Sequence, residues 1–281
     1  MKLANFLVIA NKRCGTSWLN HNLATHPDIF MAGNKGVHFF DQEFNKGLEH
    51  YAAFFTKSIE EKRRGETEHS YFWNDKVPRR IHATLGNIPM ILSLRQPIER
   101  AYSHFQLQQR IVGRTRPNSD DFEEAFKQSF ENNHNMTAWG FYGRQLKLYS
   151  KYFPIEMFHF IKFEEANEEP LQTIQKVFEF LGVDKDFVPP LVMKKWSAAT
   201  NVPIDTGELK GRILYTSVGT RLVRRLLRKV GFNHITTYNK FSPPPLDPEL
   251  KDRLTRIYDD DLKLLIDLSE QDFSSWLSSD Q

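Results

Sequence analysis

The sequence predicts an α/β fold, with a single domain over residues 1–281 and a central parallel sheet flanked by helices. Apolar runs typical of buried strands are followed at once by helical periodicity, first at Phe6–Leu19 and again at Pro89–Arg110. Strand and helix signals then alternate along the rest of the chain, as a parallel sheet requires. Hydrophobic residues make up 40% of the sequence, which is enough to bury a full core in one domain of this size.

The first strand and helix enclose a turn that has the layout of an anion site. Phe6–Ala10 is apolar throughout, and a helix is expected from about Thr16 to Ala24. At the carboxyl edge of a parallel sheet, the N–H groups that open this helix face the same point as the positive end of its dipole. Lys12 would add a full charge there, and the hydroxyls of Thr16 and Ser17 would add hydrogen-bond donors.

The order of residues in this turn differs from that of a nucleoside triphosphate loop, G-x-x-x-x-G-K-[ST], because Lys12 comes before Gly15. A cradle this short suits a single phosphate or a phosphosulfate, so the turn is interpreted as a P-loop-like strand–loop–helix site. The alternative is an ordinary strand–turn–helix unit, in which Gly15 only permits the turn and Lys12 is solvated.

A second unit repeats this arrangement further along the chain. Met90–Leu94 is predicted to be a buried strand, and Pro97 suits the first position of a helix with a buried stripe. Arg95 would then stand at the strand end, and Ser103 would lie about two turns into the helix, where both could bind a second phosphate. In the alternative, Arg95 pairs with Glu99 and Ser103 is polar surface.

Weaker signals predict the remaining elements. The stretch from Met31 to Gly86 shows no strong period and is expected to form short helices and loops on the substrate side. Val218–Val230 is typical of a basic amphipathic helix, either a solvated face or a docking surface for an anionic acceptor or a membrane. The other predicted segments are helices at Phe122–Phe130, Gly140–Phe153, Pro170–Leu181 and Pro248–Leu268, the last with Asp247 as N-cap, and a strand at Met157–Lys162.

Composition excludes several classes of protein. The net charge of +3 gives no reason to expect a nucleic-acid partner, and no metal-binding motif is present. The apolar runs fall short of the ~20 residues that cross a bilayer, so no transmembrane segment is expected. The chain enters its first strand at Phe6, so no signal peptide is expected, and a single cysteine favours a reducing, cytoplasmic location.

That cysteine, Cys14, stands next to the expected helix N-terminus, where the pKa of its thiol is expected to fall. A cysteine phosphatase would need an arginine at the position that Asn20 occupies, so this class is rejected.

Two motifs together resemble those of the PAPS-dependent sulfotransferases, in the bacterial and heparan-sulfate-type branch. NKRCGTSWL is similar to the 5′-phosphosulfate loop K-x-x-G-T-[ST]-x-L, and LRQPIERAYSHF is similar to the 3′-phosphate element R-[ND]-P-x-[ED]-R-x-x-S-x-[YF]. Weaker similarity follows the family order at His26-Pro27, HFFD, DKVP, GFYGRQLKLYSKYFP and FLGV. The resemblance implies transfer of a sulfuryl group from PAPS to a hydroxyl or amine acceptor, with PAP as the product and no metal.

The resemblance also assigns roles to individual residues. Lys12 would stabilise the leaving phosphate, and Arg95 with Ser103 would hold the 3′-phosphate. Lys76 would face the donor or the acceptor, by likeness to a Glu-Lys-[ST]-Pro motif of this branch. The 5′ loop is expected to bind the donor through Lys12, Arg13, Cys14, Gly15, Thr16, Ser17 and Trp18. A loop over the adenosine is expected at Lys210, Gly211 and Arg212, which a solvated turn would explain equally well.

The general base departs from the family pattern. Heparan-type members commonly have K-E-x-x-F-F, with the glutamate proposed to deprotonate the acceptor, but this chain has Gly36 at that position. His38 is the nearest substitute, since an imidazole suits proton abstraction near neutral pH, and a structural role for it is the alternative. An amine acceptor, or a carboxylate from Asp41 or Asp75, would also supply the missing function.

Other functions remain open at this point. A nucleotide-dependent kinase or NTPase would share the strand–loop–helix plan but would need a Mg²⁺-binding aspartate at a strand end, where Arg95 stands. A catalytically weak PAPS- or PAP-binding relative is also compatible with Gly36. The acceptor would be a small molecule, a lipid or a saccharide. Arg79 and Arg80 could bind an anionic sugar. A lipid or aromatic acceptor could instead bind in an apolar slot lined by Phe39, Phe40, Trp73, Trp139 and Phe141.

Overall fold

A five-stranded parallel sheet forms the centre of the protein. The computed structural model describes residues 1–33, 36–111, 119–194 and 245–279. The strand order is β2-β3-β1-β4-β5, and every pairing between neighbours is parallel. The strands are β1 (Phe6–Ala10), β2 (Ile29–Ala32), β3 (Arg63–Glu68), β4 (Met90–Leu94) and β5 (Phe158–Lys162). This architecture confirms the predicted α/β class.

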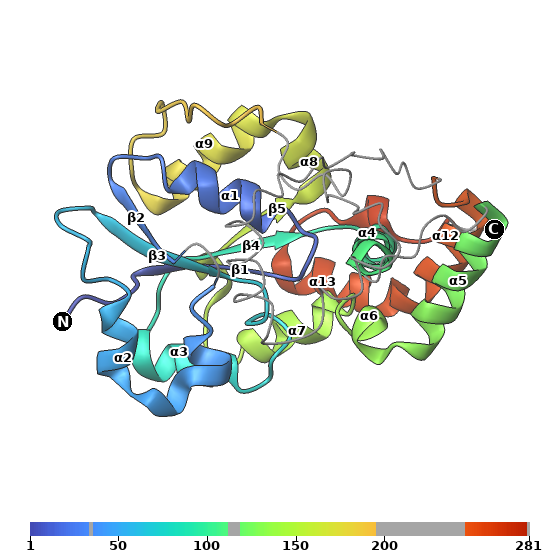
Figure 1. Cartoon of the computed structure of the whole chain (residues 1–281), viewed down its shortest axis with the longest axis horizontal. Helices are drawn as coiled ribbons and strands as arrows, with labels where there is room; N and C mark the ends of the chain where they lie inside the picture. The colour runs from blue at the N-terminus through green and yellow to red at the C-terminus, as the bar shows by residue number, and fades with distance from the viewer. Residues whose placement is uncertain (34–35, 112–118, 195–244, 280–281) are drawn as a thin grey trace, which may run out of the picture.

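Helices cover both faces of the sheet and extend one end of it (Figure 1). One face carries α1 (Thr16–Leu23), α8 (Phe163–Glu168) and α9 (Pro170–Leu181), and the other carries α2 (Leu48–Ala53), α3 (Val77–Leu85) and α7 (Tyr142–Tyr149). At the far end lie α4 (Pro97–Ile111), α5 (Ser119–Asn132), α6 (His134–Ala138) and α12 (Pro248–Thr255), with α13 (Asp259–Ser269) against α7. Short helical turns complete the described chain at Phe39–Glu43, Phe44–Lys46, Ile155–Met157, Arg256–Tyr258 and Ser274–Trp276.

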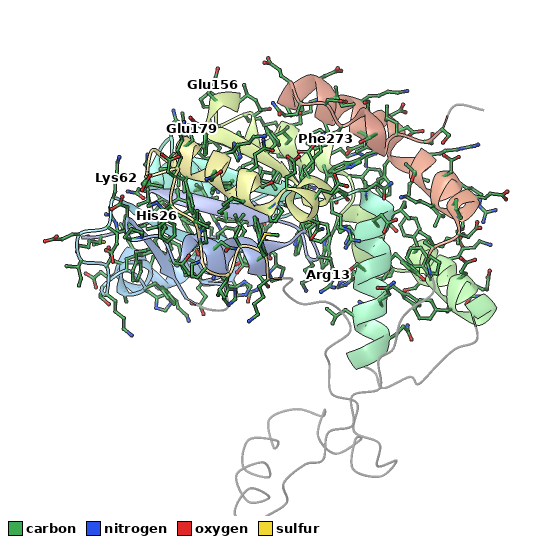
Figure 2. The ribbon with its side chains drawn as sticks, turned by 90° about the horizontal axis from the view of Figure 1, so that it is seen from above. Arg13, His26, Lys62, Glu156, Glu179 and Phe273 are labelled. Carbon is green, nitrogen blue, oxygen red and sulfur yellow. The ribbon has the colours of Figure 1, made fainter. Side chains whose placement is uncertain are left out.

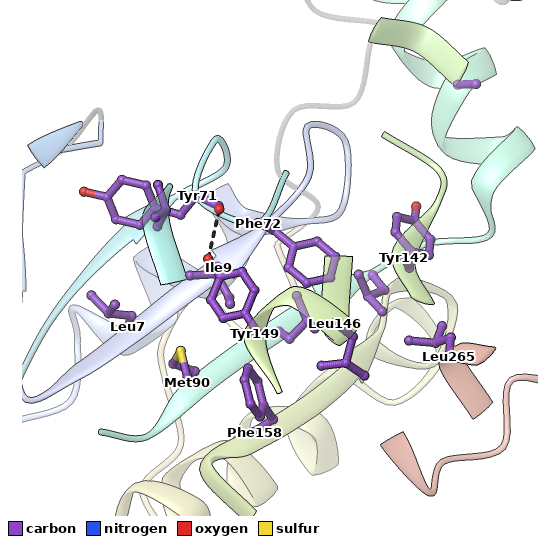
Figure 3. Close-up of a cluster of buried hydrophobic side chains, with 14 of the residues drawn as sticks. Leu7, Ile9, Tyr71, Phe72, Met90, Tyr142, Leu146, Tyr149, Phe158 and Leu265 are labelled. Atoms are coloured by element: carbon purple, nitrogen blue, oxygen red, sulfur yellow. Dashed lines mark hydrogen bonds between the residues drawn. The ribbon is translucent and has the colours of Figure 1, made fainter. Parts of the chain in front are cut away.

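The core is divided by the sheet, because successive strand side chains point to opposite faces. In β1, Phe6 and Val8 pack with α1 and α9, whereas Leu7 and Ile9 pack with α2, α3 and α7. All five residues of β1 and of β4 are buried, as expected for central parallel strands covered on both faces. Figure 3 shows the larger cluster, in which the Tyr149 hydroxyl donates to the Tyr71 carbonyl at 2.9 Å.

The strongest periodic signals are confirmed. β1, β4 and α9 have the predicted bounds, and Asp247 caps α12 by accepting a hydrogen bond from the backbone N–H of Leu250. The predicted helix Pro248–Leu268 is instead interrupted by a tight turn at Arg256–Tyr258, which separates α12 from α13. The predicted basic helix Val218–Val230 lies outside the described residues.

The prediction for Met31–Gly86 is wrong in part, because this stretch supplies β3 and half of β2 as well as the short helices α2 and α3. The sequence of β3, RRGETE, is almost entirely polar and carries no apolar alternation. It is a strand because its neighbours supply partners, and its two glutamates, Glu66 and Glu68, are fully buried. Local propensity is overridden here by tertiary contacts.

Glu66 is buried between two tyrosines. Its carboxyl group accepts a hydrogen bond from the Tyr51 hydroxyl at 2.6 Å and lies 3.3 Å from the Tyr71 hydroxyl. Burial raises the pKa of Glu66 to about 8, and the two tyrosine hydrogen bonds offset this only in part. Glu66 therefore holds a proton at neutral pH.

The protonated Glu66 predicts a loss of stability as the pH rises. Between an unfolded-state pKa near 4.5 and the folded-state value near 8, the folded chain keeps a proton that the unfolded chain has released. The free energy of unfolding is expected to fall by up to about 1.4 kcal/mol per pH unit across this window. Urea denaturation at pH 5, 6.5 and 8 should show this slope in the wild type and a flatter one in Glu66→Gln. The exposed Glu131→Gln is the control, and an unchanged slope in Glu66→Gln would contradict the assignment.

The C-terminal helix docks on α7 at a glycine. The Gly143 and Arg144 N–H groups donate to the two carboxylate oxygens of Asp261 at 2.7 and 2.9 Å, which caps the start of α7 from another helix. A Cβ at Gly143 would lie 2.2 Å from the Asp261 carbonyl oxygen and 2.9 Å from the Leu265 nitrogen. Both of these atoms are backbone, so the two helices would have to separate.

Gly143→Ala is therefore expected to destabilise the fold by about 3 kcal/mol, measured by urea denaturation. Gly47→Ala is the control, because a Cβ there meets no atom within 4 Å and costs only the strain of a positive φ. A loss below about 1 kcal/mol in Gly143→Ala would contradict the close helix contact at Gly143.

Within the described part of the chain, no helix has both the length and the apolar character that crossing a membrane requires.

Candidate functional site

Three polar segments meet at the carboxyl edge of the sheet. β1 lies between β3 and β4, with Ile9 opposite Glu68 and Ala10 opposite Ser93. The loop after β1, the end of β3 and the residues after β4 are therefore neighbours. The carboxyl edge of an open α/β sheet, beside the point where strand order reverses, is the usual place for a ligand.

The loop after β1 is shaped by Gly15. This residue has φ +81°, and a Cβ would lie 2.9 Å from the Phe163 ring at the start of α8. Gly15 is also the N-cap of α1 and has no side chain to occupy the N–H groups of the first turn. The Ser93 hydroxyl of β4 donates to the Cys14 carbonyl at 2.6 Å and so holds the loop from the neighbouring strand.

Arg13 joins this loop to the second predicted phosphate element. Its Nε donates to the Ser103 hydroxyl of α4 at 2.9 Å, and Figure 2 shows Arg13 beside that helix. The two sequence motifs, 90 residues apart, therefore meet in space. The sequence did not predict this hydrogen bond, because Ser103 was expected to bind only the 3′-phosphate.

A pocket of about 350 Å³ lies beside this contact, between α4 and the segment that precedes α12. The Arg95 guanidinium stacks over the Phe163 ring, 4.7 Å from its centroid, and pairs with Glu99 at 3.5 Å. Glu99 also pairs with Lys251 at 3.0 Å, so the Arg95 charge is only partly neutralised. The lining residues are Arg95, Glu99, Tyr102, Ser103, Gln106, Pro245 and Leu246.

Lys12 lies at the edge of the sheet against two stacked tryptophans. Its Nζ is 5.2 Å from the Trp139 ring centroid, and Trp139 stacks on Trp73 with centroids 5.6 Å apart. Asn11 holds Trp139 in place by donating its side-chain amide to the Trp139 carbonyl at 2.6 Å. A cation over an aromatic face is attracted to it without losing access to an anion.

The predicted aromatic slot divides into two parts. Trp73 is 36% exposed and stacks on Trp139 beside Lys12. Phe39 and Phe40 are instead core residues, with 2% and 0% exposure. Phe141 packs against Tyr258, so it contributes to a helix contact.

A neutral histidine lies close to these cations. Burial lowers the pKa of His104 to about 4, and the charges of Arg100, Lys12 and Arg13 add to the effect. Its ring lies 5.5 Å from the Trp139 ring. Sequence reasoning missed His104, although it follows Ser103 directly in the predicted phosphate element.

The prediction for Cys14 is wrong. Its side chain is fully buried, and burial raises the pKa of the thiol to about 11, while Arg100 and Arg95 offset this only in part. The helix N-terminus lowers a thiol pKa only where the thiolate is solvated or paired. Cys14 is therefore an unreactive packing residue at neutral pH.

Other predicted donor residues are placed differently. The Trp18 indole N–H donates to the Val192 carbonyl at 2.9 Å, in the core behind the loop. Lys76 stands just before α3 with an exposed side chain, and its backbone N–H donates to the Asn74 side chain at 3.1 Å. Lys210, Gly211 and Arg212 lie outside the described residues.

A histidine–carboxylate group lies at the end of β3. His38 Nδ1 is 3.2 Å from Glu68 Oε2 and 3.3 Å from Asp41 Oδ2. The His38 side chain is 32% exposed, whereas the Glu68 side chain is completely buried. Sequence reasoning named His38 and Asp41 but missed Glu68, because a glutamate at the end of an unpredicted strand carries no signal of its own.

Comparisons with known proteins agree with this geometry. The family described as "Sulfotransferase domain" matches residues 3–199. Human heparan sulfate glucosamine 3-O-sulfotransferase 6 is 30% identical over 239 residues, which cover 78% of this chain and 66% of that protein. Human heparan sulfate glucosamine 3-O-sulfotransferase 3B1 is 27% identical over 239 residues, which cover 80% of this chain and 60% of that protein.

A solved structure shares the fold across nearly the whole chain. The crystal structure of a sulfotransferase from Alicyclobacillus acidocaldarius aligns with a TM-score of 0.67 at 24% identity, covering 98% of this chain and 99% of that one. The chain spans 60% to 66% of the length of the two human relatives. Because the family match extends over more than half of the 281 residues, the chain belongs to the PAPS-dependent sulfotransferase family.

Proposed function

We propose that the chain transfers a sulfuryl group from PAPS to a hydroxyl or amino group of a saccharide. The observation that carries this proposal is the 2.9 Å hydrogen bond from Arg13 to Ser103, which joins the loop after β1 to the helix after β4. Two linked anion-binding elements fit a donor with phosphates at two separate positions better than a continuous triphosphate. A saccharide is proposed because the human relatives are named for heparan sulfate glucosamine.

The loop after β1 has the features needed to hold the 5′ end of the donor. Gly15 leaves the first-turn N–H groups of α1 without a side-chain cap, and Thr16 and Ser17 add hydroxyl donors. Lys12 stands beside this turn, on the face of Trp139. PAPS supplies an activated sulfuryl group, and a fixed ammonium group at Lys12 would stabilise the charge that develops on the leaving phosphate.

The pocket beside α4 has the features needed to hold the 3′-phosphate. Arg95 and Ser103 line it together, and the stacking of Arg95 on Phe163 holds the guanidinium plane in one orientation. A planar guanidinium with a neighbouring hydroxyl is well suited to binding a phosphate through more than one hydrogen bond. The partial pairing of Arg95 with Glu99 would be replaced by the stronger pairing with phosphate.

The exposed face of the Trp73–Trp139 pair is proposed to meet the acceptor. It lies beside Lys12, where transfer would occur, and one of its rings is more than a third exposed. Flat apolar rings with a polar neighbour suit the mixed surface of a sugar. The cytoplasmic location favoured by the single cysteine stays a prediction.

Calorimetric titration with adenosine 3′,5′-bisphosphate in the presence of EDTA tests the donor site. We expect metal-independent binding that Lys12→Ala and Arg95→Ala each weaken by about 10- to 100-fold, since a charge-assisted hydrogen bond is worth roughly 1.5–3 kcal/mol. Lys185→Ala is the control, because that lysine pairs with Glu179 on the surface. ATP with Mg²⁺ is titrated in parallel.

Binding of ATP with Mg²⁺ but not of the bisphosphate would contradict the proposal and favour a kinase or NTPase. Transfer of radioactive sulfate from PAPS to N-sulfated glucosamine oligosaccharides tests the acceptor class. Tight bisphosphate binding with no transfer to saccharides, phenols, lipids or amines would instead indicate a donor-binding relative without activity.

A further inference from the structure

A carboxylate from β3 fills the space beside Gly36. A Cβ built on this glycine would lie 2.0 Å from Glu68 Oε2 and 3.1 Å from Glu68 Cδ. Gly36 also has φ +67°, a conformation that side chains other than glycine rarely adopt. Position 36 is therefore glycine because Glu68 already occupies the volume that a side chain there would need.

The two oxygens of Glu68 have different surroundings. Oε1 accepts a hydrogen bond from the Ser70 N–H at 3.0 Å and lies 2.8 Å from the Ser70 hydroxyl oxygen, whose single proton is directed to Asp41 Oδ2 at 2.6 Å. Oε2 is buried and has no hydrogen-bond partner among the described residues, although His38 Nδ1 lies 3.2 Å away. Leaving a buried carboxylate oxygen unpaired is costly, so Oε2 calls for a proton donor, and His38 Nδ1 is within reach of it.

The backbone around His38 holds the imidazole in this position. His38 has φ +53°, and its carbonyl accepts hydrogen bonds from the N–H groups of Gln42 and Glu43, both at 3.0 Å. The next two residues, Phe39 and Phe40, are core side chains that anchor the turn. The imidazole is therefore attached to a rigid segment while about a third of it remains open to solvent.

The surroundings place His38 close to the proposed site of transfer. Three side chains lie within 3.3 Å of its Nδ1: Glu68 Oε2 from β3 at 3.2 Å, and Asp41 Oδ2 and Gln42 Nε2 from its own turn, both at 3.3 Å. The His69 ring lies 6.1 Å away between centroids. Burial lowers the pKa of His69, Glu68 opposes this change, and Lys12 and His38 add to it, so all three side chains lie near this one ring. Lys12 and His38 thus flank the same edge of the sheet.

We propose that Glu68 is a positioning residue for His38, supplied by β3 and not by the turn that carries His38. Glu68 accepts a hydrogen bond from the Nδ1–H group of His38. The lone pair of His38 is then on Nε2, which takes the proton of the acceptor substrate. The acceptor oxygen or nitrogen then bonds to sulfur as the bond from sulfur to the phosphate oxygen breaks, and the electron pair remains on the phosphate. The catalytic part of this inference rests on the proposed sulfuryl transfer.

Any side chain at position 36 would disturb both members of this pair. Its Cβ would overlap with Glu68 Oε2 and would also lie 3.5 Å from His38 Nε2, the nitrogen that must remain accessible. Gly36 and the buried Glu68 therefore belong to the same arrangement.

Kinetics of Glu68→Gln test the inference. We expect kcat to fall about 100-fold, with the KM for PAPS and the affinity for the bisphosphate within twofold of wild type. The acid limb of the kcat profile should move to lower pH, because a neutral amide no longer stabilises the imidazolium. Glu68→Asp should restore part of kcat, and adding Glu68→Gln to His38→Ala should cause no further loss, because Glu68 acts through His38.

Two controls separate this effect from a general loss of structure. Asp41→Asn removes the other carboxylate near Nδ1, which already accepts the Ser70 hydroxyl at 2.6 Å, and is expected to cost less than tenfold. Glu179→Gln makes the same chemical change on the surface and should leave kcat unchanged. A kcat for Glu68→Gln within threefold of wild type, or a larger loss in Asp41→Asn, would overturn the inference.

Nitrogen NMR of the histidine side chains gives a readout that needs no turnover. Wild-type His38, identified from its loss in His38→Gln, should carry its proton on Nδ1, and Glu68→Gln should reduce the population of this tautomer. A wild-type His38 protonated on Nε2 alone would overturn the inference even in an active enzyme. If the Nδ1 tautomer is found and no acceptor is sulfated, the pairing stands and the proposed function fails.

Discussion

The parallel pairing of β1 with β3 on one side and β4 on the other is the constraint on which this protein depends. Parallel strands direct all their carboxyl ends to one edge, so residues far apart in the chain become neighbours without any loop reaching across the fold. Lys12, Glu68 and Arg95 follow or end these three strands. The hydrogen bond between Arg13 and Ser103 then joins the loop after β1 to α4, which the sheet has brought together.

Polar groups buried at the end of β3 distinguish this sheet from an ordinary apolar one. Glu66 accepts a hydrogen bond from the Tyr51 hydroxyl and remains protonated at neutral pH, whereas Glu68 faces a serine and a histidine. Each costs free energy on burial, and each is offset only where a donor has been supplied. Of these two carboxyl groups, only Oε2 of Glu68 has no hydrogen-bond partner among the described residues, and it lies 3.2 Å from His38 Nδ1.

Some residues for which the sequence indicates one role have two roles in the structure. Gly15 permits a left-handed turn and also leaves room for the Phe163 ring. The Arg95 guanidinium stacks on this same ring. Trp139 is both a core side chain and the surface on which Lys12 rests. Such shared roles explain why the loop after β1, which is short, can be rigid enough to position a charge.

Local patterns were sufficient for the central strands β1 and β4. Apolar runs of five residues define β1 and β4, and proline and glycine set the bounds of α9, because these signals act through the backbone itself. The polar strand β3, the burial of Cys14 and the pairing of Glu68 with His38 were decided by tertiary structure alone. The sequence around a thiol or a carboxylate does not show whether the group will be buried. Its charge state depends on burial and on neighbours that only the folded sheet brings within 4 Å.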